Sequence, residues 1–256
     1  MTEDHAVSLR SKARIVNENP VERISLWLTS GIADFQKHLP VAIIYGVGLV
    51  ALGWGATWLL WQVGLSWMML PAMAGAMLLG PMATVGLYRL SRRQQGKGGD
   101  SIAAPGQIFL VSVVMMILLL SWIRAATLLF AIFFGLHPFP GFLESLQSLF
   151  TTPSGVALLL IGSAVGGLFA ALGFAISVFS FPMLVDRDID GFSAMGLSFN
   201  ATTQNFRLML LWAACVTVLV TIGVLTGLLA LIPLFPILGF ATWHAYADLF
   251  QESTDA

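Results

Sequence analysis

Long, unbroken apolar stretches are the feature of this sequence that most restricts its fold. A bilayer core about 30 Å thick is crossed by a helix of roughly 20 apolar residues. Six stretches reach or approach that length, over residues 40–63, 67–88, 107–135, 155–184, 208–232 and 233–249. The last is short and begins with Pro233 and Pro236. Because the runs are continuous rather than alternating, they predict spanning α-helices and not the strands of a barrel.

The composition supports the same fold class. Hydrophobic residues make up 57% of the 256 residues and charged residues 10%, whereas soluble domains carry about 25% charged residues. A soluble globular enzyme, a disordered chain and a nucleic-acid binder are therefore excluded, and the net charge of −1 offers no basic surface for nucleic acid. The chain is expected to be all-α, a polytopic bundle of six transmembrane helices over residues 20–250. Residues 1–19 and 251–256 form polar tails.

The lysine and arginine residues indicate the orientation. Eleven of the twelve lie before the first span, between the second and third, or between the fourth and fifth. The loops after the first, third and fifth spans carry none. Positive residues favour the cytoplasmic side of a membrane, so both termini are expected in the cytoplasm.

Amphipathic segments are predicted beside the spans. The first begins at Asn19-Pro20, typical of a helix N-cap, and the second is capped by Asp190. Both are expected to lie along the cytoplasmic interface, and a third, short one (residues 142–150) lies outside. The apolar positions of the first are Val21, Ile24, Leu28, Ile32, Phe35 and Leu39, and those of the second are Phe192, Met195, Phe199 and Phe206.

The two cytoplasmic segments match each other at an offset of 167 residues, which pairs Ile32 with Phe199 and Leu39 with Phe206. Each leads into a span, and the hairpins that follow end in similar Ala-Thr and Tyr positions. We interpret this as a three-hairpin repeat with a weak middle copy. Chance matching of short apolar strings is the alternative.

Small residues recur at four-residue spacing in two of the spans. Gly162, Gly166 and Ala170 form one such row in the fourth span, and residues 72, 76, 80 and 84 form another in the second. Small residues let helix backbones approach closely. The rows therefore predict helix packing, with a substrate path as the alternative.

Arg124 is the one charged residue inside the first five spans. An arginine near the middle of a span costs about 2.5–3.5 kcal/mol on insertion scales. It is expected to face other helices or water. An anion, headgroup or partner site is one interpretation, and a structural role within the bundle is the other.

Two further groups of polar residues are candidates for function. Asp186, Arg187, Asp188 and Asp190 resemble the opening of a calcium loop, but Leu197 stands where its last ligand, a glutamate, is required. The alternative is a turn in which Asp190 caps the next helix and Arg187 pairs locally. Trp243, His244 and Tyr246 lie near the inner end of the sixth span, where tryptophan and tyrosine fit an interface belt. His244 is interpreted as a hydrogen-bonded structural histidine rather than a ligand.

Several longer strings resemble one family, DUF2189, predicted integral membrane proteins of bacteria. They are Phe181–Asp190 with Ala194-Met195, Trp122–Phe130, Gly80-Pro81 with Leu87-Tyr88, and Leu238–Tyr246. The likeness covers roughly residues 40–250. It implies a six-span inner-membrane protein with no established activity. Relatives often have histidine at the position of Phe240, which would pair with His244, so the phenylalanine here argues against a metal pair.

These observations favour a non-enzymatic accessory, assembly or lipid-organising component. We see no catalytic constellation and expect no cofactor and no metal. The bilayer is one partner, and a membrane-protein partner or a second copy of the chain is another. A small-solute or lipid transporter that uses Arg124 is one alternative, and a haem- or metal-binding membrane protein is the other.

Overall fold

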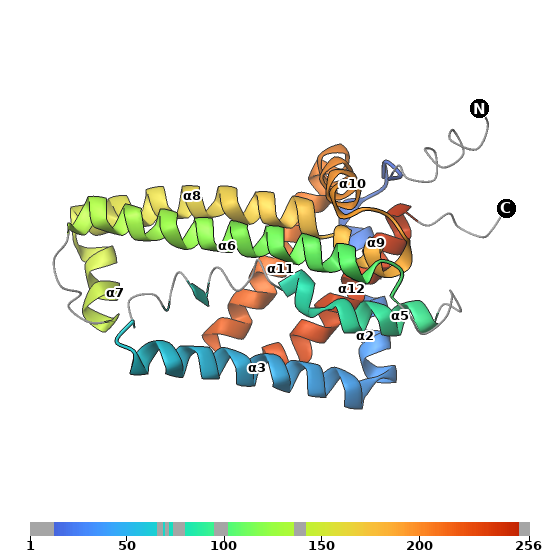
Figure 1. Ribbon diagram of the computed structural model, residues 1–256, viewed down its shortest axis with the longest axis horizontal. Coiled ribbons are helices and arrows are strands. Elements are labelled where there is room, and N and C mark those ends of the chain that lie inside the picture. The colour runs from blue at the N-terminus through green and yellow to red at the C-terminus, as the bar shows by residue number, and fades with distance from the viewer. Residues whose placement is uncertain are drawn as a thin grey trace. The chain divides into compact units, whose positions relative to one another are not determined.

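The computed structural model describes residues 13–65, 69, 72–73, 80–94, 102–135 and 142–250, and this part contains helices and no strand. The helices are shown in Figure 1. Their bounds are α2 (Pro20–Lys37), α3 (Leu39–Gln62), α5 (Val85–Gln94), α6 (Pro105–Phe134), α7 (Phe142–Thr151), α8 (Pro153–Ser177), α9 (Ser180–Asp186), α10 (Gly191–Gln204), α11 (Phe206–Leu225) and α12 (Leu231–Phe250). The all-α prediction is confirmed.

Within the described residues, four helical segments are long and apolar enough to cross a membrane. They are α3, α6, the α8–α9 segment (Pro153–Asp186) and α11, and they correspond to the predicted first, third, fourth and fifth spans. Much of the predicted second span lies outside the described residues. The predicted sixth span forms a helix, α12, but it is not among the four. Its C-terminal half carries His244, Tyr246 and Asp248, which make it more polar than the others.

The chain forms two compact units, of which one comprises residues 53–80 and 112–174. In this unit α6 and α8 lie side by side (Figure 1), with the rings of Trp122 and Phe169 5.9 Å apart. A Cβ added to Gly166 would lie 3.0 Å from the Trp122 ring, so the small residue admits the indole. The packing role predicted for Gly166 is confirmed. Gly162, by contrast, meets only a side chain of its own helix.

The other unit comprises the chain up to Leu52, residues 81–111 and the chain from Ala175 onward. Its central element is α12, where Phe240, Ala241, Trp243, Ala245 and Tyr246 are fully buried. α2 crosses α12 so closely that a Cβ on Gly31 would lie 2.8 Å from the Ala241 nitrogen. On another side of α12, Gly239 faces Leu87 and Thr84.

Capping fixes where α2 and α10 begin. The Asn19 side chain accepts a hydrogen bond from the Val21 N–H, and Pro20 follows as the first helical residue. The Asp190 carboxylate accepts one from the Ser193 N–H at 2.9 Å. Both predicted caps are confirmed. Each cap satisfies a donor that the first turn leaves without an intrahelical partner.

The predicted fourth span is interrupted where α8 meets α9. Helical structure breaks at residues 178–179, and Ser198 of α10 bridges the break. Its buried hydroxyl accepts from the Phe179 N–H at 3.1 Å and donates to the Ala175 carbonyl at 2.7 Å. Because a side chain from a distant part of the sequence supplies these bonds, the local apolar pattern does not reveal the break.

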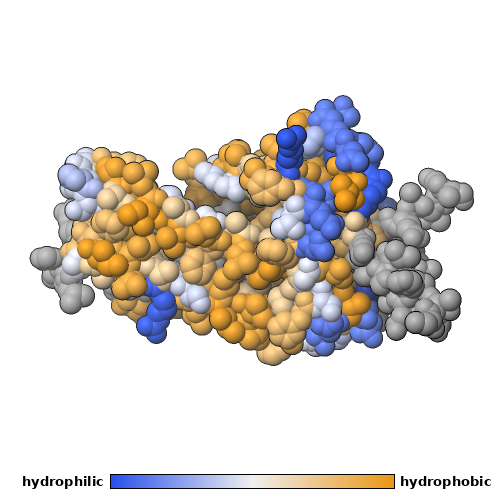
Figure 2. All heavy atoms as spheres, turned by 90° about the horizontal axis from the view of Figure 1, so that it is seen from above, coloured by the Kyte–Doolittle hydropathy of each residue, from blue (hydrophilic) through white to orange (hydrophobic). Residues whose placement is uncertain are grey.

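The visible face in Figure 2 is largely hydrophobic. The helices long and apolar enough to span a membrane expose large apolar side chains, with Phe109 and Leu168 both 72% exposed and Leu225 80% exposed. Exposed apolar area of this extent marks a surface that contacts lipid or another protein, and it agrees with the membrane class.

Candidate functional site

The C-terminal half of α12 carries the main cluster of polar interactions. His244, Tyr246 and Asp248 stand at alternate positions of the helix. His244 and Asp248 contact α2, and Tyr246 contacts the end of α9. All of these contacts lie within one compact unit. We call this cluster, together with its partners, the α12 junction.

His244 joins α12 to α2. Its Nε2 lies 2.9 Å from an Asp34 carboxylate oxygen, and both side chains are mostly buried. The hydrogen bond expected of His244 is present. One turn earlier, Phe240 is fully buried, with its ring 6.5 Å from that of His38. The phenylalanine therefore occupies packed space beside the junction.

Tyr246 joins α12 to the end of α9. Its hydroxyl donates to an Asp186 carboxylate oxygen at 2.8 Å, and Arg92 of α5 lies 3.5 Å from the same carboxylate. Arg187 lies 3.8 Å from Asp186 and donates to the Phe250 carbonyl. The local pairing predicted for Arg187 is confirmed. These bonds hold three helix ends together around one carboxylate.

Asp248 joins α12 to α2 and to the segment before it. It accepts a hydrogen bond from the Trp27 indole N–H at 3.0 Å. Arg23 and Arg14 lie 3.4 and 3.5 Å from it. The backbone adds to this attachment, since the Arg14 N–H donates to the Leu249 carbonyl at 2.9 Å. The bond from the Trp27 indole to the carboxylate is charge-assisted, and such bonds are among the stronger hydrogen bonds in proteins.

The interface-belt interpretation of Trp243 and Tyr246 is wrong. Both side chains are fully buried, because they form part of an aromatic stack inside the unit. Tyr88 stacks on Trp243 with ring centres 6.1 Å apart, and Tyr246 stacks on Phe250 at 5.6 Å. A belt residue would expose one edge to the headgroups, whereas these rings fill the interior.

The acidic turn before α10 does not gather its carboxylates around one point. Asp186 bonds Tyr246 and Asp190 caps α10, while Asp188 is exposed. Hydrogen bonds from the Ser193 side chain and backbone hold the pKa of the Asp190 carboxyl below its ordinary value. Among the described residues, no group of three or more His, Cys, Asp or Glu is arranged to hold a metal ion. The capping interpretation therefore accounts for Asp190.

Arg124 lies on α6, in the unit formed by residues 53–80 and 112–174, and its side chain is exposed. Ser121 and Thr127 flank it at three-residue spacing. Their hydroxyls donate to carbonyls of their own helix, at Ile117 and Ile123. The guanidinium thus stands on an otherwise largely apolar helix with two short polar neighbours.

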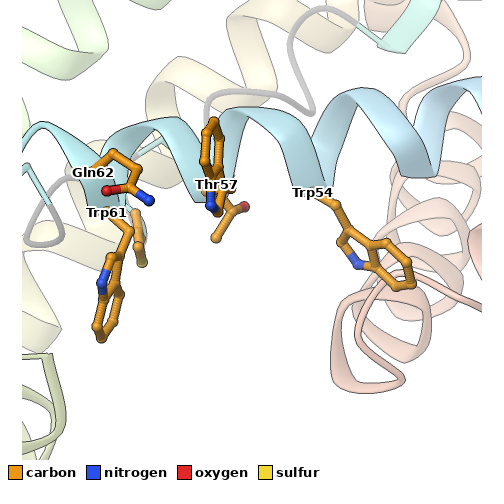
Figure 3. Close-up of a pocket in the computed structure, with 6 residues that line it drawn as sticks. Trp54, Thr57, Trp61 and Gln62 are labelled. Atoms are coloured by element: carbon orange, nitrogen blue, oxygen red, sulfur yellow. The ribbon is translucent and has the colours of Figure 1, made fainter.

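A shallow apolar hollow lies along the second half of α3. It has a volume of about 480 Å³ and is lined by Trp54, Thr57, Trp58, Trp61, Gln62 and Met69. Trp54 and Trp61 project from the same side of the helix (Figure 3). The Thr57 hydroxyl donates a hydrogen bond to the Gly53 carbonyl at 2.8 Å.

Sequence reasoning missed half of the α12 junction. Asp34, Trp27 and Arg23 of α2, together with Arg92 and Asp248, were not among the candidate residues. One signal was available, because His244, Tyr246 and Asp248 place three polar groups in five residues of an apolar helix. Their partners lie between 60 and 234 residues away in sequence, which no local pattern indicates.

The spanning helices and the exposed apolar surface define the chain as a helical integral membrane protein. Residues 69–186, which include α5 to α9, match the family model of DUF2189, described as a predicted integral membrane protein. The match ends at Asp186 of the α12 junction, and it confirms the resemblance to this family. No curated protein and no solved structure is significantly similar to the chain.

Proposed function

We propose that this chain is a non-enzymatic accessory or lipid-organising component of the bacterial inner membrane. The observation that carries the proposal is the way the α12 junction uses its polar groups. Asp34, Asp186 and Asp248 are each engaged by side chains of the same chain. Carboxylates held in this way tie helices together, whereas a catalytic acid or base must reach a substrate.

The proposal includes a definite topology. Six spans place both termini in the cytoplasm, and α2 and α10 lie along the cytoplasmic interface. The lysine and arginine distribution supports this orientation. The junction then joins the interfacial segments to the inner ends of the spans, as a rigid cytoplasmic-side platform.

Purification of the tagged full-length protein in a mild detergent tests the role. Co-eluting proteins and phospholipids are identified and counted by mass spectrometry. We expect a protein or lipid at fixed stoichiometry, retained equally by the Asp188→Ala control and reduced when Asp186→Ala loosens the junction. Protein that elutes without either would contradict the accessory role.

Transport is the second candidate, and the exposure of Arg124 on a spanning helix favours it. Liposomes that contain the protein and labelled inorganic phosphate provide the test, because the guanidinium suits an anion. Release that Arg124→Ala abolishes and Ser121→Ala preserves would replace the accessory proposal with a transporter. Haem or metal binding is less favoured, since His244 is engaged by Asp34.

A further inference from the structure

The described structure repeats itself at α2 and α10. At the offset of 167 residues, Ile24, Trp27 and Gly31 correspond to Gly191, Ala194 and Ser198, and all six are buried. Every exposed position from residue 24 to 40 has an exposed counterpart from 191 to 207. Every position in the first range that is not exposed has a counterpart that is not exposed either. Most of the paired residues differ in type, so the agreement reflects a shared arrangement rather than similar residues.

The ends of the two helices also correspond. His38 terminates α2 with φ −115° and ψ 31°, and its counterpart Asn205 terminates α10 with φ −106° and ψ 39°. After this single residue the chain enters α3 or α11, and both are long and apolar enough to span a membrane. Each copy is therefore a short helix, a one-residue break and a span.

The buried faces are held against the protein by different means. Gly31 lets α2 approach the backbone of α12, whereas Ser198 hydrogen-bonds the break between α8 and α9. The contact at Gly31 and the contact at Ser198 differ in kind, but α2 and α10 expose the same positions before their spans. The two copies therefore share the placement of the helix and not the contact that holds it.

Each copy leaves an apolar edge exposed beside its buried face. Ile32 is 41% and Phe199 45% exposed, and Leu39 and Phe206, which open the spans, are 47% and 62% exposed. The spans that begin at Leu39 and Phe206 also expose other apolar side chains, such as Ile44 on α3 and Leu210 on α11. The neighbouring positions, Ala33 and Asn200, are exposed on another side of each helix.

We propose that α2 and α10 are two copies of one lipid-inserting unit, whose Ile32 and Phe199 edges enter the acyl-chain boundary of the same leaflet. Each edge ends at the exposed apolar residue that opens a span, which argues for lipid as the occupant. α10 has no charged residue between Gly191 and Gln204, so its immersion comes from apolar burial rather than from attraction to anionic headgroups. This deepens the lipid-organising role and rests on the membrane placement proposed above.

Spin-label accessibility in nanodiscs of phosphatidylcholine alone tests the unit. In a Cys215→Ala background, single cysteines replace Ile32, Phe199 and their matched controls Ala33 and Asn200, and each carries a nitroxide. The measured quantity is the ratio of collision rates with oxygen, which partitions into acyl chains, and with a water-soluble nickel chelate. We expect this ratio to be several-fold higher at 32 than at 33, and several-fold higher at 199 than at 200.

Equal ratios within either pair would overturn the proposal, as would high nickel accessibility at 32 or 199. All four positions are exposed, so the labelled proteins are expected to fold, and circular dichroism of the purified variants verifies it. The outcome is separable from the proposed function. Arg124-dependent phosphate release would refute the accessory role while leaving the depth difference intact, and equal ratios without release would refute only the lipid-inserting unit.

Discussion

At the scale of single residues, Asp248 shows how one carboxylate serves several helices. It accepts from the Trp27 indole, which is 3% exposed, and it lies close to Arg23 and Arg14. We expect Asp248→Ala to lower the free energy of unfolding by about 1–3 kcal/mol, because a buried donor loses its acceptor. Asp248→Asn keeps an oxygen for the indole and should lose less, since partly exposed ion pairs contribute little.

Thermal unfolding of the detergent-solubilised protein, followed by circular dichroism, measures both variants of Asp248. Asp188→Ala serves as the control, because Asp188 is exposed and its removal should change the midpoint little. If Asp248→Asn is as damaging as Asp248→Ala, then the charge and not the indole bond dominates at this position.

At the scale of elements, the close crossing of α2 and α12 depends on Gly31. A Cβ there would meet backbone atoms of Ala241 and Ile237 at 2.8 Å, which cannot move aside as a flexible side chain would. We expect Gly31→Ala to destabilise the protein by about 1–3 kcal/mol through overpacking. Gly196→Ala is the matched control, since a Cβ meets nothing within 4 Å there and should stabilise α10 by roughly 0.5–1 kcal/mol.

Unfolding midpoints of the two glycine variants should therefore move in opposite directions. Limited proteolysis adds a local readout, because a loosened α2 should be cleaved earlier than in the parent protein. A stabilising effect of Gly31→Ala would mean that α2 does not approach α12 as closely as described.

The start of α10 gives a prediction about pH. The pKa of Asp190 is lowered, first by the Ser193 side chain, so the cap stabilises α10 above the ordinary aspartate pKa. That contribution is lost as the pH falls through the lowered folded-state pKa. We expect Asp190→Ala to cost about 1 kcal/mol and Asp190→Asn to cost less, because asparagine also caps. The effect is measured as the protection of the first α10 amides against hydrogen exchange, relative to an unstructured chain, above and below that pKa. Protection that does not change with pH in the parent protein would contradict the prediction.

The helices also show how much of the fold can be predicted from the sequence. Hydropathy placed α3, α6 and α11 to within a few residues of their N-terminal ends, because a spanning helix must be apolar along its whole length. The caps at Asn19 and Asp190 were predictable because capping is local. The end of α11 was predicted seven residues too late, since Leu225 is followed by a turn in which Gly227 and Leu228 have positive φ.

The site was less predictable for a related reason. The sequence indicated that His244 and Tyr246 matter, but their partners Asp34 and Asp186 are brought to them only by the tertiary fold. The amphipathic pattern of α2 likewise suggested one apolar face. In the structure that face is divided, since Ile24 is buried against the protein and Ile32 is exposed. Periodicity reports that a face is apolar, and it does not report what covers each part of it.

At the scale of the whole molecule, the proposed topology depends on an even number of spans. α12 is not among the four helical segments that are apolar and long enough to cross a membrane, so its crossing is the most informative one to test. The loop before it contains Leu229, which is 52% exposed. If α11 and α12 both cross, this loop lies outside, while Asp188 and the end of α12 lie inside.

Cysteine labelling in intact cells tests that arrangement. In a Cys215→Ala background, we expect a membrane-impermeant maleimide to label Leu229→Cys and Thr151→Cys in spheroplasts. Asp188→Cys should react only after the membrane is permeabilised, because eleven lysine and arginine residues hold that side in the cytoplasm. A fluorescent reporter that matures only in the cytoplasm, joined after Ala256, should be bright. If Asp188→Cys reacts only after permeabilisation but the reporter is dark, α12 does not cross, and the α12 junction would then need another location relative to the bilayer.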